Sequence, residues 1–169
     1  MINRVYIGFS TTNMILSRLI RWFTRSKVSH CWFRVYEPTL EQWLVLSAGL
    51  LGYEIYLYPK YKKSNTVVAE FVSGVDLFPA AKEMVKDVGD TFDFCGLLGM
   101  GLVIAARRWF NTKMKNPFDD SGKMFCSEAV MRLLQLGKVA GSESFDPSLT
   151  TPEVLLRFLS CSPQFARVG

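Results

Sequence analysis

The sequence predicts an α+β fold in which an antiparallel sheet of about five strands packs against helices. Two observations carry this prediction. β-branched and aromatic runs broken by turn residues fill the first half of the chain, and apolar residues at helical spacing fill the second half. Strands and helices in separate blocks are typical of α+β folds. The chain has 169 residues and neither an internal repeat nor a linker, so we expect residues 1–169 to form a single domain.

The N-terminal segment predicts a strand and then a basic amphipathic helix. Residues Arg4 to Ser10 alternate as a strand does, and the Thr-Thr-Asn-Met segment after them supplies caps for a helix that runs to about Arg25. Its apolar side carries Ile15, Leu19, Trp22 and Phe23, and its basic side carries Arg18, Arg21 and Arg25. We expect the apolar side to pack on the core, which is the commoner arrangement, and binding to a membrane surface stays open as the alternative.

The segment from Val28 to Ser73 predicts an antiparallel meander. Its four strand-like runs are VSHCWFRVY, QWLVLSA, GYEIYLY and NTVVAEFVS. The breaks EPTLE, GLLG and PKYKKS are short enough to connect neighbouring strands. In the first run, strand alternation places His30 on one face and Cys31 on the opposite face.

The residues after Gly74 predict four helices, which cover DLFPAAKEMVKDVG, DFCGLLGMGLVIAARRWF, CSEAVMRLLQLG and TPEVLLRFL. The apolar run from Phe94 to Ala106 is shorter than the roughly 20 residues that span a bilayer, so we expect a buried helix. A polar loop with Pro and Gly, NTKMKNPFDDSGK, leads toward Cys126. Loops that enter helices are favoured positions for functional residues.

Composition and charge exclude several classes of function. The net charge of +5 favours anionic partners such as a phospholipid surface or an acidic wall polymer, and because we find no nucleic-acid motif we expect no nucleic-acid partner. Four scattered cysteines, without a C-x-x-C pair and with one histidine, argue against a metal site, and we expect no cofactor. The N-terminus lacks the features of a secretory signal, so we expect a cytoplasmic protein with free thiols.

Cys126 and His30 are the candidate catalytic residues. A helix N-terminus stabilises negative charge, so a thiol at that position can have a lowered pKa. Ser127 and Glu128 suit the first turn of a helix, although the carboxylate would oppose a thiolate. The alternative is that Cys126 only packs, since free cysteine is among the most buried residue types, and that His30 is structural.

Four segments of the chain occur in the order of one known family's motifs. They are Ser29-His30 at the start of a strand, FDFCGLLG at 92–99, FCSEAV at 125–130 and DPSLTTPEVL at 146–155. Together they resemble the circularly permuted papain-like cysteine hydrolases of NlpC type, whose relatives include the lecithin retinol acyltransferase-like proteins. In that permuted group the histidine strand precedes the nucleophile, which is the order in this chain.

The resemblance implies a permuted papain-like fold with Cys126 as nucleophile and His30 as base. The family also has a third polar residue, on the strand after the histidine strand, that orients the imidazole. The matching position is Ser47, a departure, because a serine supplies no negative charge to an imidazolium. Glu54 on the next strand or a main-chain carbonyl stay open as alternatives. The family's tyrosine is Phe92 in this chain.

The function implied by the resemblance is that of a thiol hydrolase, of cysteine peptidase type, acting on an amide. In bacterial and phage members the substrate is most often a cell-wall peptide, so a peptidoglycan endopeptidase or amidase is the first expectation. A lipid ester hydrolase or acyltransferase with an acyl-lipid substrate is the second. The third is a catalytically idle module of a larger assembly, such as a phage particle, which would make the protein virion-associated. The sequence does not identify substrate-binding residues.

Overall fold

The sheet of this protein has six strands, all antiparallel to their neighbours, in the order β4-β3-β2-β1-β5-β8. The computed structural model describes residues 4–49, 51–92, 103 and 123–168. The strands are β1 (Tyr6–Thr11), β2 (His30–Glu37), β3 (Gln42–Gly49), β4 (Gly52–Leu57), β5 (Thr66–Ser73) and β8 (Phe165–Arg167). The predicted α+β class is confirmed, and the sheet exceeds the expected five strands because C-terminal residues add β8 beside β5.

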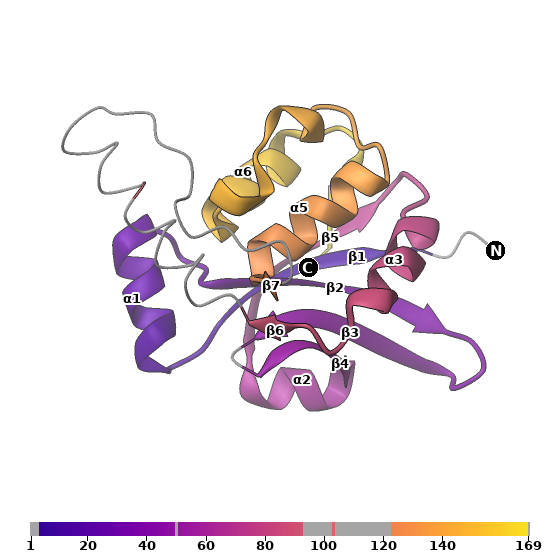
Figure 1. The fold of residues 1–169 in the computed structure, drawn as a ribbon, viewed down its shortest axis with the longest axis horizontal. Helices are drawn as coiled ribbons and strands as arrows, with labels where there is room; N and C mark the ends of the chain where they lie inside the picture. The colour runs from indigo at the N-terminus through magenta and orange to yellow at the C-terminus, as the bar shows by residue number, and fades with distance from the viewer. Residues whose placement is uncertain (1–3, 50, 93–102, 104–122, 169) are drawn as a thin grey trace.

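Helices lie on both faces of the sheet, and one helix lies beyond its end. In the described part of the chain they are α1 (Ile15–Thr24), α2 (Tyr58–Ser64), α3 (Phe78–Met84), α5 (Cys126–Leu136) and α6 (Pro152–Cys161). Short 3-10 turns cover Val85–Asp87, Ser142–Ser144 and Pro147–Leu149, and the pair β6 (Thr91–Phe92) and β7 (Lys123–Met124) is parallel. Helices α3, α5 and α6 cover one face and α2 covers the other (Figure 1).

The segment PKYKKS, expected to be a connection, belongs to helix α2, whose start tolerates Pro59 because the first helical N–H has no intrahelical acceptor. The apolar run from Phe94 to Ala106 and the polar loop after it lie outside the described residues, except for Val103 and for Lys123, which begins β7. Across the ranges that the structure describes, no helix is long and apolar enough to cross a membrane.

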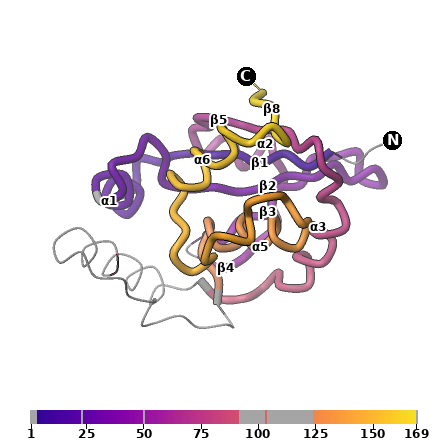
Figure 2. Tube along the Cα trace, turned by 90° about the horizontal axis from the view of Figure 1, so that it is seen from above, coloured from indigo at the N-terminus to yellow at the C-terminus, as the bar shows by residue number. Residues whose placement is uncertain are grey.

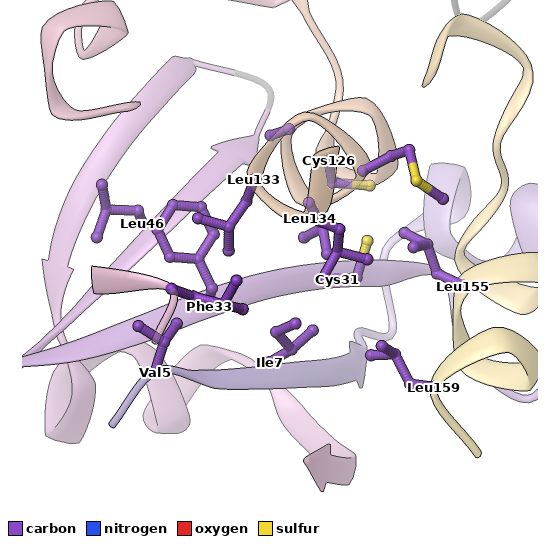
Figure 3. Close-up of a cluster of buried hydrophobic side chains, with 14 of the residues drawn as sticks. Val5, Ile7, Cys31, Phe33, Leu46, Cys126, Leu133, Leu134, Leu155 and Leu159 are labelled. Carbon is purple, nitrogen blue, oxygen red and sulfur yellow. The ribbon is translucent and has the colours of Figure 1, made fainter. Parts of the chain in front are cut away.

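The main core lies between the sheet and helices α5 and α6. Ile7, Phe33 and Leu46 point from the sheet toward Leu133 and Leu134 of α5, and all five are buried (Figure 3). Burying a side chain of this size contributes roughly 1.5–3 kcal/mol relative to leaving it exposed. This contact fixes α5 across β2 and β3, and with it the position of the first residue of α5.

A second, smaller cluster covers the opposite face of the sheet. It consists of Trp32, Val45 and Tyr61, which are all buried. Trp32 lies directly opposite Gly8 of β1, and a Cβ at residue 8 would come within 2.2 Å of the Trp32 ring. The absence of a side chain at Gly8 therefore leaves the space that the Trp32 indole occupies next to α2. The alternation predicted for β2 is confirmed at Trp32 and Phe33, which belong to opposite clusters.

Helix α1 lies beyond one end of the sheet and not over either face (Figures 1 and 2). It connects the end of β1 to the beginning of β2. Its N-cap is Met14, and no side chain caps it, so the expected threonine or asparagine cap is wrong. The expected packing of its apolar side on the core is also wrong, because Ile15, Leu19 and Trp22 are exposed.

Candidate active site

Cys126 is the first residue of α5, as the sequence predicted. The residue before it, Phe125, has an extended backbone and no side chain caps the helix. The first N–H groups of a helix have no intrahelical acceptor, so they point their partial positive charge at the region of the thiol. Cys126 is only 8% exposed, and Ser127 and Glu128 after it are buried. Cys126 therefore combines a helix N-terminus with a site that excludes most of the solvent.

The Cys126 sulfur is in contact with the thiol of Cys31. Figure 3 shows the two side chains pointing toward one another, Cys31 from β2 and Cys126 from the start of α5. The pKa of Cys126 lies well below the ordinary value, chiefly because the Cys31 thiol donates a hydrogen bond to it. The charge of His30 and a hydrogen bond from its ring lower that pKa further, whereas burial opposes the shift.

The pKa of Cys31 moves in the opposite direction. Burial raises it, and the hydrogen bond and charge of Cys126 raise it further. Of the two thiols, Cys126 is therefore the one that ionises, and Cys31 remains a protonated donor. The sequence did not indicate a role for Cys31, because strand alternation shows which face a residue is on but not which helix residue lies above it.

His30 is the first residue of β2 and is half-buried. Its Nε2 lies 2.7 Å from Ser47 Oγ, and its ring stacks on Tyr61 with the centroids 6.5 Å apart and the planes at 28°. Strand alternation assigns His30 to the sheet face that carries Trp32. However, His30 is the first residue of the strand, and at this end of the sheet its ring interacts with Cys126. Since Ser47 occupies Nε2, Nδ1 is the nitrogen that is left for the thiol.

Ser47 and Glu54 were the alternatives for the residue that orients the imidazole. They lie directly opposite one another on β3 and β4. Ser47 is buried and contacts His30, whereas the Glu54 carboxylate accepts a hydrogen bond from the Tyr56 hydroxyl. The geometry thus brings Ser47, and not Glu54, to the imidazole.

Tyr61 of α2 is a further polar member of the site that sequence reasoning missed. Its hydroxyl lies 3.3 Å from Ser10 Oγ. Burial raises the pKa of this phenol strongly, and hydrogen bonds from Ser10 and Ser47 only partly offset the rise, so Tyr61 stays protonated. No sequence signal indicated this role, because the segment that carries Tyr61 was interpreted as a connection.

Glu128 was expected to oppose a thiolate at Cys126. Its carboxylate is buried and pairs with Arg132, one turn later in α5, at 2.5 Å between Oε1 and Nη2. The guanidinium offsets the negative charge of Glu128. This pairing leaves less negative charge at Glu128 to oppose a thiolate at Cys126.

The remaining cysteines and other features lie apart from this site. Cys161 is exposed at the end of α6, and Cys95 lies outside the described residues. A surface hollow of about 420 Å³ lies at the far end of α5, lined by Gln135, Lys138, Ser142 and Glu143. Within the ranges described, His, Cys, Asp and Glu side chains form no group of three or more that could hold a metal ion.

The sequence was compared with models of known protein families and with curated proteins. No family model matches it, and no curated protein is significantly similar to it. The function is therefore inferred from the site that Cys126, His30 and Ser47 form, together with Cys31 and Tyr61.

Proposed function

We propose that the protein is a thiol hydrolase that acts on an amide, with Cys126 as nucleophile and His30 as base. The observation that carries this proposal is the placement of Cys126 at the first residue of α5 beside the imidazole of His30, which contacts Ser47 Oγ at 2.7 Å and helps to lower the pKa of the thiol. Burial opposes this shift, and burial is the chief cause of the raised pKa of Cys31. A thiol whose pKa is lowered at a helix N-terminus by a neighbouring imidazole is typical of a nucleophile.

The arrangement supports acyl transfer in two half-reactions. His30 takes the thiol proton, and the Cys126 thiolate attacks the substrate carbonyl. Main-chain N–H groups at the start of α5 stabilise the oxyanion, and the imidazolium gives its proton to the leaving amine, which leaves a thioester on Cys126. His30 then deprotonates a water that attacks the thioester and frees the acid. Ser47 accepts from the protonated Nε2 during these steps and keeps the ring in orientation.

The resemblance to NlpC-type permuted papain-like hydrolases supports the choice of substrate. The antiparallel sheet, with the histidine strand before the cysteine helix, is compatible with that fold. Bacterial and phage members of that family act most often on cell-wall peptides. We therefore propose a peptidoglycan peptide as the first substrate class, and the activity as that of an endopeptidase or amidase.

One observation favours a second candidate, a lipid ester hydrolase or acyltransferase. Helix α1 leads into the strand that carries His30, and it exposes Ile15, Leu19 and Trp22 together with basic residues. An apolar and basic surface beside the site suits an acyl-lipid substrate. The third candidate, an idle module of a larger assembly, rests on the absence of an acid at Ser47. It predicts that Cys126 reacts no faster than an ordinary buried thiol.

The test is hydrolysis of purified peptidoglycan fragments and, in parallel, of a short-chain acyl ester and a phospholipid. We expect one class to be cleaved, with Cys126→Ala abolishing the cleavage. Cys161→Ala is the matched control, because Cys161 is an exposed cysteine at the end of α6 and should leave the rate unchanged. Cleavage that survives Cys126→Ala would overturn the proposal, as would no cleavage of any of these substrates by the folded protein.

A further inference from the structure

Helix α1 presents three large apolar side chains to the solvent. Ile15 is 77% exposed, Leu19 53% and Trp22 74%. On an α-helix these three positions follow one another at intervals of three and four residues, so they form one stripe along the helix. A surface helix normally turns such a stripe toward the core.

The side of α1 that faces the protein is anchored by hydroxyl groups instead. Ser17 is buried, and its Oγ lies 2.6 Å from Ser29 Oγ and donates to the Thr12 carbonyl at 2.8 Å. Just after the helix, Ser26 Oγ donates to the Glu153 carboxylate of α6 at 2.6 Å. These bonds fix the helix with its apolar stripe outward, so the exposure does not result from a loosely attached helix.

The charge around the stripe has one sign. Arg18 and Arg25 are exposed on α1, Lys27 follows it, and the sequence contains no Asp or Glu before Glu37. Glu153 of α6 is an acidic group near the end of α1, and its carboxylate accepts from Ser26 Oγ and pairs with Arg157. Among the residues that the structure describes, the exposed charges on and just after α1 are therefore positive.

We propose that α1 docks on the surface of an anionic phospholipid bilayer. The helix lies in the plane of the membrane, Ile15 and Leu19 enter the boundary between headgroups and acyl chains, and Trp22 sits at the headgroup level. Arg18 and Arg25 contact lipid phosphates, with their aliphatic stems along the stripe. A protein partner would need an acidic margin matched to this helix, whereas an anionic bilayer supplies both the negative surface and the apolar layer.

The docking geometry follows from the chain connection. Because α1 leads directly into β2, whose first residue is His30, docking brings the end of the sheet that carries His30 to the membrane. The proposal does not depend on catalysis. A protein without Cys126 should dock equally well, so the proposed function and the proposed docking fail separately.

The experiment is sedimentation of the full chain with vesicles. The probes are phosphatidylcholine vesicles with about one third phosphatidylglycerol and vesicles of phosphatidylcholine alone. We expect binding to the anionic vesicles that weakens as salt is added. Arg18→Gln with Arg25→Gln should weaken it roughly five-fold per charge. Leu19→Asn should weaken it roughly ten-fold, because the side chain no longer enters the apolar layer.

Three controls make the result decisive. Leu40→Asn changes another exposed leucine, 59% accessible, in the turn between β2 and β3 at the other end of β2, and should leave binding intact. Cys126→Ala should bind as the unchanged chain does, and circular dichroism should show each variant folded. The proposal is overturned if the folded chain does not sediment with anionic vesicles, or if Leu40→Asn weakens binding as much as Leu19→Asn. It is equally overturned if the stripe instead drives a dimer that Leu19→Asn dissociates.

Discussion

Alkylation of Cys126 by iodoacetamide should depend on pH far less than alkylation of an ordinary thiol, and two contacts in the site should be responsible. The causes that lower the pKa of Cys126 are the hydrogen bond from Cys31 and the charge and hydrogen bond of His30. The perturbations are therefore Cys31→Ala and His30→Ala. Cys31→Ser is the matched control, because a serine hydroxyl can still donate to the sulfur.

The expected change of the alkylation rate with pH follows from the fraction of the thiol that is ionised. An ordinary thiol with a pKa of about 8.5 is about half ionised at pH 8.5 and roughly 0.3% ionised at pH 6, so its rate rises more than 100-fold between the two. A thiol whose pKa lies well below that value is largely ionised at both, and its rate should change by less than about ten-fold. The low exposure of Cys126 slows the reagent at every pH alike. The ratio of the two rates, and not either rate alone, reports the pKa.

The variants should move this ratio in a defined direction. Removing either Cys31 or His30 takes away a cause that lowers the pKa of Cys126, whereas burial, which raises that pKa, remains. The ratio for Cys126 should then rise toward that of an ordinary thiol. In Cys31→Ser it should stay nearer to that of the unchanged protein.

The assay is mass-spectrometric quantification of each cysteine peptide against time, with N-acetylcysteine in the same tube as reference. At mildly acidic pH we expect Cys126 to be labelled ahead of Cys31, Cys95 and Cys161 in the folded protein. A ratio for Cys126 equal to that of the reference would refute the reasoning. So would a ratio that His30→Ala leaves unchanged, and either result would favour the idle module.

Two further predictions concern the orientation of the imidazole and the packing of the sheet. Ser47→Ala should lower turnover of the cleaved substrate more than Glu54→Gln, because Ser47 contacts the imidazole directly, and steady-state kinetics giving the reverse ranking would show that the wrong residue was chosen. Gly8→Ala should lower the free energy of unfolding by roughly 1–3 kcal/mol or more in urea titrations, because its Cβ would overlap the Trp32 ring. Gly49→Ala, whose Cβ would meet no atom within 4 Å, is the control, and equal losses for the two would contradict the packing argument.

Local patterns predicted the elements that carry the site. The alternation in β2 and the polar-to-apolar change at Cys126 depend only on neighbours in the chain, and the structure starts a strand at His30 and a helix at Cys126. The position of Ser47 on the following strand also came from the sequence, through the resemblance. Its 2.7 Å contact with the imidazole is a feature that only the folded chain shows.

The features that the sequence did not reveal depend on packing between distant segments. Cys31 and Cys126 are far apart in the chain, and nothing in either segment indicates that their thiols meet. Tyr61 lies in a segment of lysines and tyrosines that resembles a turn, and its burial follows from the place of α2 over Trp32. The outward stripe of α1 reverses the usual direction because the hydroxyl of Ser17 is bonded on the inner side. A periodic pattern does not tell which side faces the protein.

The contact with Cys31 can replace the effect of an acidic residue at the position of Ser47, where the chain has a serine. The equilibrium between a neutral thiol–imidazole pair and a thiolate–imidazolium pair depends on the difference between the two pKa values. A carboxylate beside the imidazole would favour the charged pair by stabilising the imidazolium, whereas a hydrogen bond from Cys31 favours it by stabilising the thiolate.

Stabilising the thiolate through Cys31 has a chemical cost, because the nucleophilicity of a thiolate falls roughly three-fold for each unit by which its pKa is lowered. Cys31→Ala should therefore reduce the fraction of thiolate at acidic pH but make each thiolate more reactive. At a pH well above the pKa of Cys126 in the variant, the variant should be alkylated faster than the unchanged protein, and a variant that is slower at every pH would show that Cys31 only fills space.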